Sequence, residues 1–464
     1  LTAGGTGVNV EADVPGGPRA YAWSPDGRRI ALLAQPSPGV RGIHALTLEL
    51  LHVESGTRTP LTAAGALLAP RFAPDGSRLV VLAPAGEVPI YSPNQAFEVV
   101  DRELVPFGGL DRDLRGFAWL PSGGGVAWAA DGTRGALWTL GDHEPRRWPL
   151  GYVEPLSAVS VGPRGEVAFV GSMPQRAPEL YVVDAAGVPA RRLTDVNPPP
   201  PGVALGHVET VAWTGSDGSR QDGVLVRPPD FDPGRRYPLV LSLHGGPMAA
   251  STEGWVGLRQ LLAAHGWLVF CPNYRGSNHR GTAFQTSVLG DPAEGPSADI
   301  LAGVEALRQR GIVDDDRRAL SGWSYGGYLS AWLAATSEGW SAAIAGAPVV
   351  DWRDAYILSD LGPLFGPTIG PSPWDAGADW DAASPLAHLD TYTAPTLILA
   401  CTGDRRVPIT HAYRLFSGLR ARGTEVTFVA YPVSGHAPSD PVHQRDVMRR
   451  WVDWLWRAFQ SRRV

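Results

Sequence analysis

The sequence contains no lysine, and the 40 residues counted as lysine or arginine are all arginine. Without a lysine amine the chain cannot form a Schiff base with pyridoxal phosphate or a carbonyl substrate, and it cannot build a Walker A phosphate loop. Its two cysteines, Cys271 and Cys401, are too few for a disulfide framework or a cysteine-based zinc site. The sequence also has no His-Glu-x-x-His motif. We therefore expect neither a metal nor a cofactor.

Long apolar runs and basic clusters are missing as well. No stretch approaches the roughly 18 apolar residues of a membrane-spanning helix, so no membrane partner is expected. The net charge is −6 and the arginines form no basic run, which argues against a nucleic-acid partner. A length of 464 residues with 44% hydrophobic content predicts a globular protein of two or three domains. We take the cytoplasm as its expected location and leave open whether it forms a homo-oligomer.

A short turn motif occurs four times in the first part of the chain. Each copy has an apolar pair, a Pro-x-Gly turn and then a run of β-forming residues; the copies are Trp23–Gly27, Phe72–Gly76, Trp119–Gly123 and Val161–Gly165. Proline presets the first turn residue and glycine accepts the positive φ that closes the turn, so each copy predicts a hairpin. The turn glycines are 49, 47 and 42 residues apart, which is the spacing of one four-stranded β-propeller blade per repeat. The alternative is an irregular stack of antiparallel hairpins.

The pattern changes near residue 200, where the proline-rich segment 197–202 predicts a stiff linker. Beyond it, strand-like apolar runs alternate with helical segments, which predicts a mostly parallel sheet covered on both faces. The expected strands are 239–243, 267–270, 342–345, 396–400 and 426–429. The chain is expected to close with an amphipathic helix whose apolar face is Val447, Met448, Trp451, Val452, Leu455, Ala458 and Phe459. We expect this face to pack in the core rather than to bind a cofactor or a membrane.

Ser324 is the expected nucleophile. It lies in Gly322-Trp323-Ser324-Tyr325-Gly326, between an apolar run that ends at Leu320 and a helical stretch from Tyr328 to Ala335. Such a nucleophile elbow requires glycines around the serine, because the turn from strand to helix is strained and crowded. A glycine-rich helix cap with an incidental serine is the alternative.

A serine hydroxyl needs a histidine to take its proton, and a carboxylate to orient that histidine. Asp404 directly follows the expected strand that ends near Cys401, and His436 follows the next strand by a short loop. The order serine, acid, histidine is that of the α/β-hydrolase fold. His411 and His443 are weaker candidates for the base, and Asp440 and Asp446 are weaker candidates for the acid because they lie beyond His436.

The developing oxyanion needs main-chain N–H donors close to Ser324. His244-Gly245-Gly246-Pro247 follows the first strong strand of the second half, and its glycines let the main chain approach a substrate closely. We therefore expect the N–H groups of Gly246 and of Tyr325 to form the oxyanion hole, and a structural role for His244.

These motifs together resemble the prolyl oligopeptidase family of serine peptidases. The resemblance rests on the repeats, on the His-Gly-Gly-Pro and Gly-Trp-Ser-Tyr-Gly-Gly-Tyr motifs, on Pro272–Ser277, on Gly403–Pro408 and on Gly435-His436, and it covers nearly the whole chain. The His-Gly-Gly-Pro form is similar to the acylaminoacyl-peptidase branch. The resemblance implies cleavage of short peptides, with a propeller that restricts access.

The resemblance also implies a substrate site. Arg406, two residues after the expected acid, would contact a substrate carbonyl or terminal carboxylate, although its charge would serve a surface ion pair equally well. Trp352 and Tyr356 fall where relatives build the apolar pocket for the residue before the scissile bond, with core packing as the alternative.

The sequence departs from the family in the size of its first domain. We expect a β-propeller over residues 1–205 and an α/β-hydrolase domain over residues 206–464. About 200 residues allow four or five blades, whereas the resemblance implies seven or eight, so the propeller is either short or lacks N-terminal blades. The resemblance also implies that the dipeptidyl-peptidase branch carries a pair of glutamates that binds a free amino terminus. No adjacent Glu pair occurs in residues 1–205, which argues against this branch unless the pair lies in missing blades.

The predicted function is therefore a serine peptidase of the acylaminoacyl-peptidase or oligopeptidase type. A carboxylesterase or small-molecule amidase would use the same elbow, and a dipeptidyl-type aminopeptidase would use the same triad. An inert hydrolase domain carried by a propeller that recruits a protein is the alternative that involves no catalysis.

Overall fold

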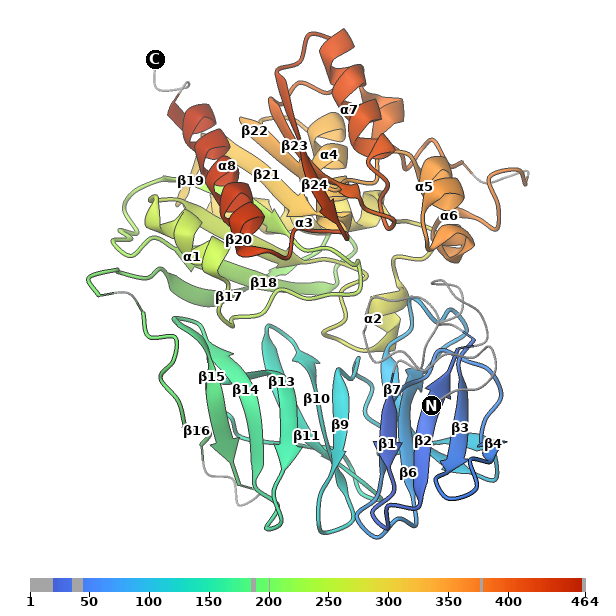
Figure 1. The fold of residues 1–464 in the computed structure, drawn as a ribbon. Coiled ribbons are helices and arrows are strands. Elements are labelled where there is room, and N and C mark those ends of the chain that lie inside the picture. Colours follow the sequence, from blue (N-terminus) through green and yellow to red (C-terminus); the bar gives the residue numbers. More distant parts are fainter. Residues whose placement is uncertain (1–19, 36–44, 185–188, 200, 376–378, 461–464) are drawn as a thin grey trace. The chain divides into compact units, whose positions relative to one another are not determined.

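The computed structural model describes residues 20–35, 45–184, 189–199, 201–375 and 379–460. The chain divides into two compact units, of which the first is Leu1–Pro199 with Asn278–Gln285 and the second is Pro200–Ser277 with Thr286–Val464 (Figure 1). Of the expected linker 197–202, residue 200 lies outside the described residues.

The first unit is built from four-stranded antiparallel sheets, each running in chain order. The strands are β1 Tyr21–Trp23, β2 Arg29–Ala34, β3 Thr47–His52 and β4 Arg58–Pro60; β5 Leu68–Phe72, β6 Leu79–Pro84, β7 Asn94–Val100 and β8 Glu103–Pro106; β9 Gly116–Trp119, β10 Gly125–Asp131, β11 Arg134–Leu140 and β12 Arg146–Arg147; β13 Glu154–Val161, β14 Val167–Met173, β15 Arg176–Val183 and β16 Arg191–Arg192. The described residues hold four such sheets, which confirms the four-stranded repeat and excludes an irregular stack of hairpins.

Each turn motif connects the first two strands of its sheet, as expected. The turn glycines Gly27, Gly76, Gly123 and Gly165 all have positive φ, between 69° and 94°. Three apolar clusters join the sheets pairwise in chain order, the first to the second, the second to the third and the third to the fourth. The repeats therefore pack face to face in series.

The second unit contains one eight-stranded sheet in the order β17-β18-β20-β19-β21-β22-β23-β24. The strands are β17 His207–Thr214, β18 Arg220–Arg227, β19 Tyr237–Leu243, β20 Leu268–Asn273, β21 Val313–Trp323, β22 Ala342–Gly346, β23 Thr396–Gly403 and β24 Val426–Ser434. Five of its pairings are parallel, which confirms a mostly parallel sheet. The pairings of β17 with β18 and of β18 with β20 are antiparallel. Strands β17 and β18 were not expected from the sequence.

Helices cover both faces of this sheet, as Figure 1 shows. The α-helices of the described residues are α1 Gly257–Ala264, α2 Thr282–Thr286, α3 Glu294–Gln309, α4 Tyr325–Thr336, α5 Trp352–Leu358, α6 Gly366–Ile369, α7 Thr410–Ala421 and α8 Pro441–Gln460, and the 3₁₀ turns are η2 Gly362–Phe365 and η3 Pro385–His388. Most of α2 belongs to the first unit. Helices α1 and α8 share one apolar cluster with the sheet. On the other face, α3 packs against Phe270, with Gly303 close to its ring.

The expected closing helix is α8, and its apolar face packs in the core as predicted. Trp451, Leu455 and Phe459 are buried in the cluster with the sheet. Two details differ from the expectation, because Met448 is exposed on the helix surface and Trp454, which was not expected, is buried.

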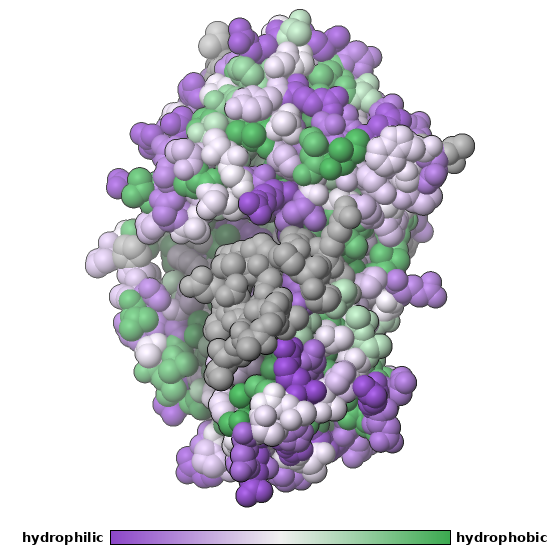
Figure 2. Space-filling model, turned by 45° about the vertical axis from the view of Figure 1, so that its right-hand side comes forward, coloured by the Kyte–Doolittle hydropathy of each residue, from purple (hydrophilic) through white to green (hydrophobic). Residues whose placement is uncertain are grey.

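Hydrophilic and hydrophobic side chains are interspersed over the face drawn in Figure 2. Among the described residues, no helix has both the length and the apolar character that a bilayer span requires.

Candidate active site

Ser324 lies between the end of β21 and the start of α4, in a backbone conformation that few residues adopt. Its φ is 60° and its ψ is −122°. A side chain at positive φ is strained, and such strain persists only where the surrounding structure enforces it. The amide of Ser324 donates to the carbonyl of Gly346 on β22 at 2.8 Å, which fixes the turn to the neighbouring strand.

The glycines of the motif leave no room for a side chain. A Cβ on Gly326 would lie 2.1 Å from the carbonyl oxygen of Leu243, and one on Gly327 would lie 2.2 Å from that of Gly346. A Cβ on Gly322 would lie 2.4 Å from the main chain of Gly326. Because these neighbours are backbone atoms, they cannot move aside as a flexible side chain would. The first turn of α4 therefore packs directly on the strands that carry it, which is the close packing of a nucleophile elbow.

His436 and Asp404 form a hydrogen-bonded pair at the ends of β24 and β23. His436 Nδ1 lies 2.7 Å from Asp404 Oδ2, and Asp404 is buried. The other carboxylate oxygen, Oδ1, accepts from the main-chain N–H groups of Arg406 and Val407 at 2.8 and 3.1 Å. An ionised carboxylate can only accept, so this contact places a proton on Nδ1 and leaves Nε2 to accept one.

The carbonyl oxygen of His436 is tied to the residue that precedes Ser324. The indole Nε1 of Trp323 donates to this oxygen at 2.9 Å. His436 Nε2 is buried and, within the described part of the chain, has no hydrogen-bond partner, so no hydrogen bond joins it to Ser324. Catalytic hydrogen bonds are often long before substrate binds. In the sequence Trp323 stands only as a member of the motif, because nothing there shows that its side chain reaches a residue 113 positions away.

The expected oxyanion loop runs beside the serine. A Cβ on Gly245 would lie 3.3 Å from Ser324 Cβ and 3.9 Å from its Oγ. Gly246 has a φ of 120°, and a Cβ there would lie 2.4 Å from the main-chain nitrogen of Met248. Tyr325 is the first residue of α4. The loop after β19 and the start of α4 therefore both lie next to Ser324.

The expected substrate residues lie in different surroundings. Arg406 pairs with Asp360, with Nε 2.7 Å from Oδ1. Trp352 is 2% exposed and packs edge-on against Tyr328 and Phe365. Its environment is that of a core residue.

Tyr356, one turn further along α5, is half-buried. Its ring packs edge-on between Trp374 and Trp380, at centroid distances of 5.9 and 5.4 Å. Trp374 is 75% exposed, so this ring cluster extends to the protein surface.

The weaker candidates for base and acid each have another partner or environment. His411 is buried, its Nδ1 accepts from the amide of Val350 at 3.3 Å, and burial lowers its pKa to about 4, so it stays neutral near pH 7. His443 pairs with Asp440 at the start of α8. Hydrogen bonding to Arg450 lowers the pKa of Asp446 to about 2.

Residues 257–462 match the model of the prolyl oligopeptidase family. The chain thus carries a prolyl oligopeptidase family domain. The chain is 30% identical over 312 residues to the uncharacterized peptidase YuxL of Bacillus subtilis. The aligned residues make up 64% of this chain and 46% of that protein. It is 29% identical over 245 residues to the acylamino-acid-releasing enzyme of Rattus norvegicus, covering 50% of this chain and 33% of the enzyme. The chain thus spans less than half the length of these curated relatives.

A solved structure shows the same fold. The acylaminoacyl peptidase of Pyrococcus horikoshii superposes with a TM-score of 0.83 at 22% identity, over 95% of this chain and 70% of that one. The likeness therefore covers the four-stranded sheets as well as the prolyl oligopeptidase family domain.

Proposed function

We propose that the chain is a serine peptidase that hydrolyses short peptides, with Ser324 as nucleophile, His436 as general base and acid, and Asp404 as the residue that orients His436. The observation that carries the proposal is the strained elbow at Ser324 together with the His436–Asp404 pair. Strands β21, β23 and β24 are parallel members of one sheet, so the loops at their carboxyl ends gather at one edge. The Trp323 contact to the carbonyl of His436 supports this placement.

The chemistry follows from these groups. His436 Nε2 takes the proton of the Ser324 hydroxyl as Oγ bonds to the peptide carbonyl carbon, and the carbonyl electron pair moves to the oxygen. The N–H groups of Gly246 and Tyr325 would hold this oxyanion. His436 then gives its proton to the leaving amine as the C–N bond breaks. Water attacks the acyl-enzyme by the same route and returns the proton to Ser324.

We infer that the four sheets are blades of a β-propeller and that the domains are residues 1–205 and 206–464. Supports for this are the serial packing of the sheets and the fold shared with acylaminoacyl peptidase. A propeller would exclude large folded substrates, so we propose oligopeptides, with an acylaminoacyl end as the preferred form. A cytoplasmic location and a homo-oligomer stay predictions.

We propose that Arg406 and Tyr356 take part in substrate binding. The Arg406 guanidinium has five donors, and Nε and Nη2 face Asp360 at 2.7 and 3.5 Å. A substrate carbonyl would then bind to an arginine that is already held in place. For Trp352, which the sequence analysis placed with Tyr356, burial among aromatic rings supports the alternative of core packing.

The test compares wild type with Ser324→Ala and with Ser337→Ala, which alters the C-terminal end of the same helix. We expect wild type and Ser337→Ala to react with a fluorophosphonate probe and to hydrolyse N-acetyl-peptide p-nitroanilides, and Ser324→Ala to do neither. Full hydrolysis by Ser324→Ala would refute the assignment. Failure of wild type to react with the probe would favour the inert scaffold.

The same three proteins separate the substrate classes. Turnover of p-nitrophenyl esters without turnover of any peptide would favour the esterase. Preference for peptides with a free amino end, released two residues at a time, would favour the dipeptidyl type. Preference for N-acetylated peptides supports the proposal as stated.

A further inference from the structure

The oxyanion loop is held from one side by the segment that follows β20. The phenolic hydroxyl of Tyr274 donates to the carbonyl oxygen of His244 at 2.5 Å, and the two rings stack at 4.3 Å between centroids. Ser277 Oγ lies 2.9 Å from His244 Nε2 and donates to the carbonyl of Tyr274 at 2.6 Å. His244 directly precedes Gly245 and Gly246, so its main chain and its imidazole are both fixed by this segment.

Tyr274 is suited to hold this position. It is fully buried, and burial raises its pKa well above the usual value, so the hydroxyl stays protonated and donates. Its ring also lies against that of Tyr325, at 6.1 Å between centroids. One buried side chain therefore contacts both segments that carry the expected oxyanion donors.

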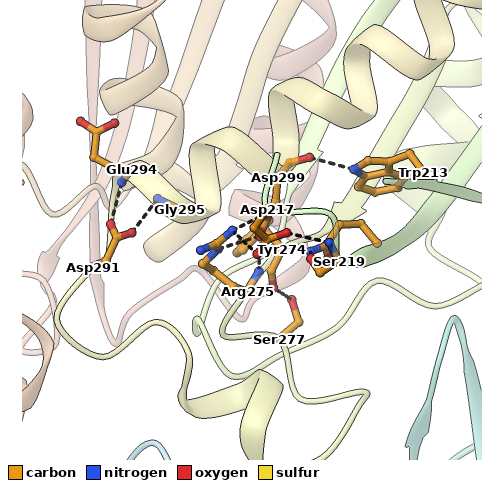
Figure 3. A network of polar contacts seen from close by, with 11 residues as sticks. Trp213, Asp217, Ser219, Tyr274, Arg275, Ser277, Asp291, Glu294, Gly295 and Asp299 are labelled. Atoms are coloured by element: carbon orange, nitrogen blue, oxygen red, sulfur yellow. Dashed lines mark hydrogen bonds and ion pairs between the residues drawn. The ribbon is translucent and has the colours of Figure 1, made fainter. Parts of the chain in front are cut away.

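The segment is itself anchored to α3 by an ion pair, drawn in Figure 3. The guanidinium of Arg275 donates to Asp299 through Nε at 3.0 Å and Nη2 at 2.9 Å, and its main-chain N–H donates to the same carboxylate at 2.9 Å. Asp299 is 0% exposed. Arg275 also reaches the exposed Asp217 at 3.3 Å. A Cβ on Gly295, at the start of α3, would lie 2.5 Å from Arg275 Cδ, so only glycine allows this approach.

The second expected donor rests on the same part of the chain. The hydroxyl of Tyr325 donates to the carbonyl oxygen of Pro292, just before α3, at 2.5 Å. Asp291 accepts from the main-chain N–H groups of Glu294 and Gly295, both at 2.9 Å, which holds the start of this helix (Figure 3). The beginning of α3 is therefore linked to the loop of Gly246 through Arg275 and Tyr274, and to Tyr325 directly.

We propose that Tyr274 and Ser277 are positioning residues for the oxyanion hole, holding the His244–Gly246 main chain against Ser324, and that the Arg275–Asp299 ion pair fixes their segment. The proposal rests on the function proposed above. If the proposal holds, Tyr274 and Ser277 stabilise the tetrahedral intermediate, through the position of the oxyanion donors, and do not contribute to substrate binding. Both side chains are fully buried, so they act through His244.

The test uses Tyr274→Phe and Ser277→Ala in the full chain. Tyr274→Phe keeps the ring stacked on His244 and removes only the hydroxyl. Loss of one oxyanion donor lowers kcat by about 10²–10³-fold, so a donor that is displaced but present should lower it by about tenfold. We expect this fall in kcat with little change in KM. We also expect the affinity for a peptide boronic acid, which forms a tetrahedral adduct, to fall by a similar factor.

Asp299→Asn and Asp217→Asn form a matched pair, because both carboxylates contact the same Nη2 of Arg275. We expect Asp299→Asn to lower kcat and Asp217→Asn to leave it unchanged. Thermal unfolding of each variant shows whether a loss of activity is a loss of fold. If Asp299→Asn does not fold, Tyr274→Phe and Ser277→Ala decide the question.

A second measurement does not depend on activity. Hydrogen exchange of the amides of residues 244–246 should be faster in Tyr274→Phe and Ser277→Ala than in wild type, while exchange in α8 stays the same. Wild-type exchange together with wild-type kcat and boronate affinity in both variants would overturn the inference. If wild type hydrolyses no substrate and exchange at residues 244–246 is still faster in the two variants, the positioning role is upheld and the proposed function is refuted.

Discussion

Replacing Asp404 with asparagine tests how His436 is held. The two main-chain hydrogen bonds to Asp404 Oδ1, from Arg406 and Val407, survive only if the amide oxygen of the new asparagine takes the Oδ1 position. The amide NH₂ group then faces His436 Nδ1, where Oδ2 lay at 2.7 Å. An NH₂ group can only donate, so Nδ1 must accept and the imidazole proton moves to Nε2. In that tautomer Nε2 cannot take the proton of Ser324.

The expected effect is large on catalysis and small on stability. The wrong histidine tautomer in a Ser–His–Asp triad lowers kcat by about 10⁴-fold, which corresponds to about 5.5 kcal/mol in the activation free energy. The asparagine has the same shape and keeps two hydrogen bonds, so the free energy of unfolding should fall by only about 1–2 kcal/mol. The assay is kcat on a peptide p-nitroanilide, with urea unfolding of the same preparations.

Asp440→Asn is the matched control. Asp440 Oδ2 lies 2.7 Å from His443 Nδ1, the same distance as in the pair of Asp404 and His436, but this pair lies at the start of α8. We expect wild-type kcat in this variant. Near wild-type kcat in Asp404→Asn, with or without a loss in Asp440→Asn, would refute the assignment of Asp404 as the orienting acid.

Three further predictions concern other parts of the domain. Trp323→Phe removes the donor to the carbonyl of His436, and kcat should fall by about tenfold with KM nearly unchanged; an unchanged kcat would show that this contact does not position the base. Burial lowers the pKa of His411 from about 6.5 in the unfolded chain to about 4 in the folded chain, so its contribution to stability is present above pH 6.5 and is lost between pH 6.5 and 4. When the pH falls from 7.5 to 5, the free energy of unfolding in urea should therefore decrease by about 2 kcal/mol more in wild type than in His411→Gln. Equal decreases in the two proteins would contradict this. Gly326→Ala places a Cβ against backbone and should lower the melting temperature strongly, whereas Gly418→Ala in α7 would meet only the end of the Leu389 side chain and should not; similar melting curves for both would contradict the packing argument.

Features with a local cause could be predicted from the sequence. The Pro-x-Gly turns require positive φ at glycine within a few residues, and the structure has it at every copy. The elbow at Ser324 has its cause in the adjacent glycines, and the structure shows the close packing that they permit. The sheet order brings the loops of Asp404 and His436 to neighbouring positions because consecutive parallel strands end at the same edge.

Features that depend on tertiary packing were missed or left open. Strands β17 and β18 were not predicted. Val211, Ala212 and Trp213 follow one another in His207–Thr214, so apolar and polar residues do not alternate there as in a half-buried strand. Whether Arg406 serves a substrate or an ion pair stayed open, because its partner Asp360 lies 46 residues away in the sequence. Met448 falls on the apolar stripe of α8 by periodicity alone, yet its side chain lies outside the cluster with the sheet and is exposed.

The position of the oxyanion loop depends on residues outside the His-Gly-Gly-Pro motif. Arg275 and Asp299 are 24 residues apart and meet only because α3 packs across β17, β18 and β20. A buried carboxylate without its arginine would be strongly destabilising, so the pair fixes α3 and the Tyr274–Ser277 segment relative to each other. The loop at Gly246 gains its position from that pair, through contacts that involve neither the nucleophile nor the base. A variant of Asp299 should therefore impair catalysis although the Ser324, His436 and Asp404 side chains remain in place.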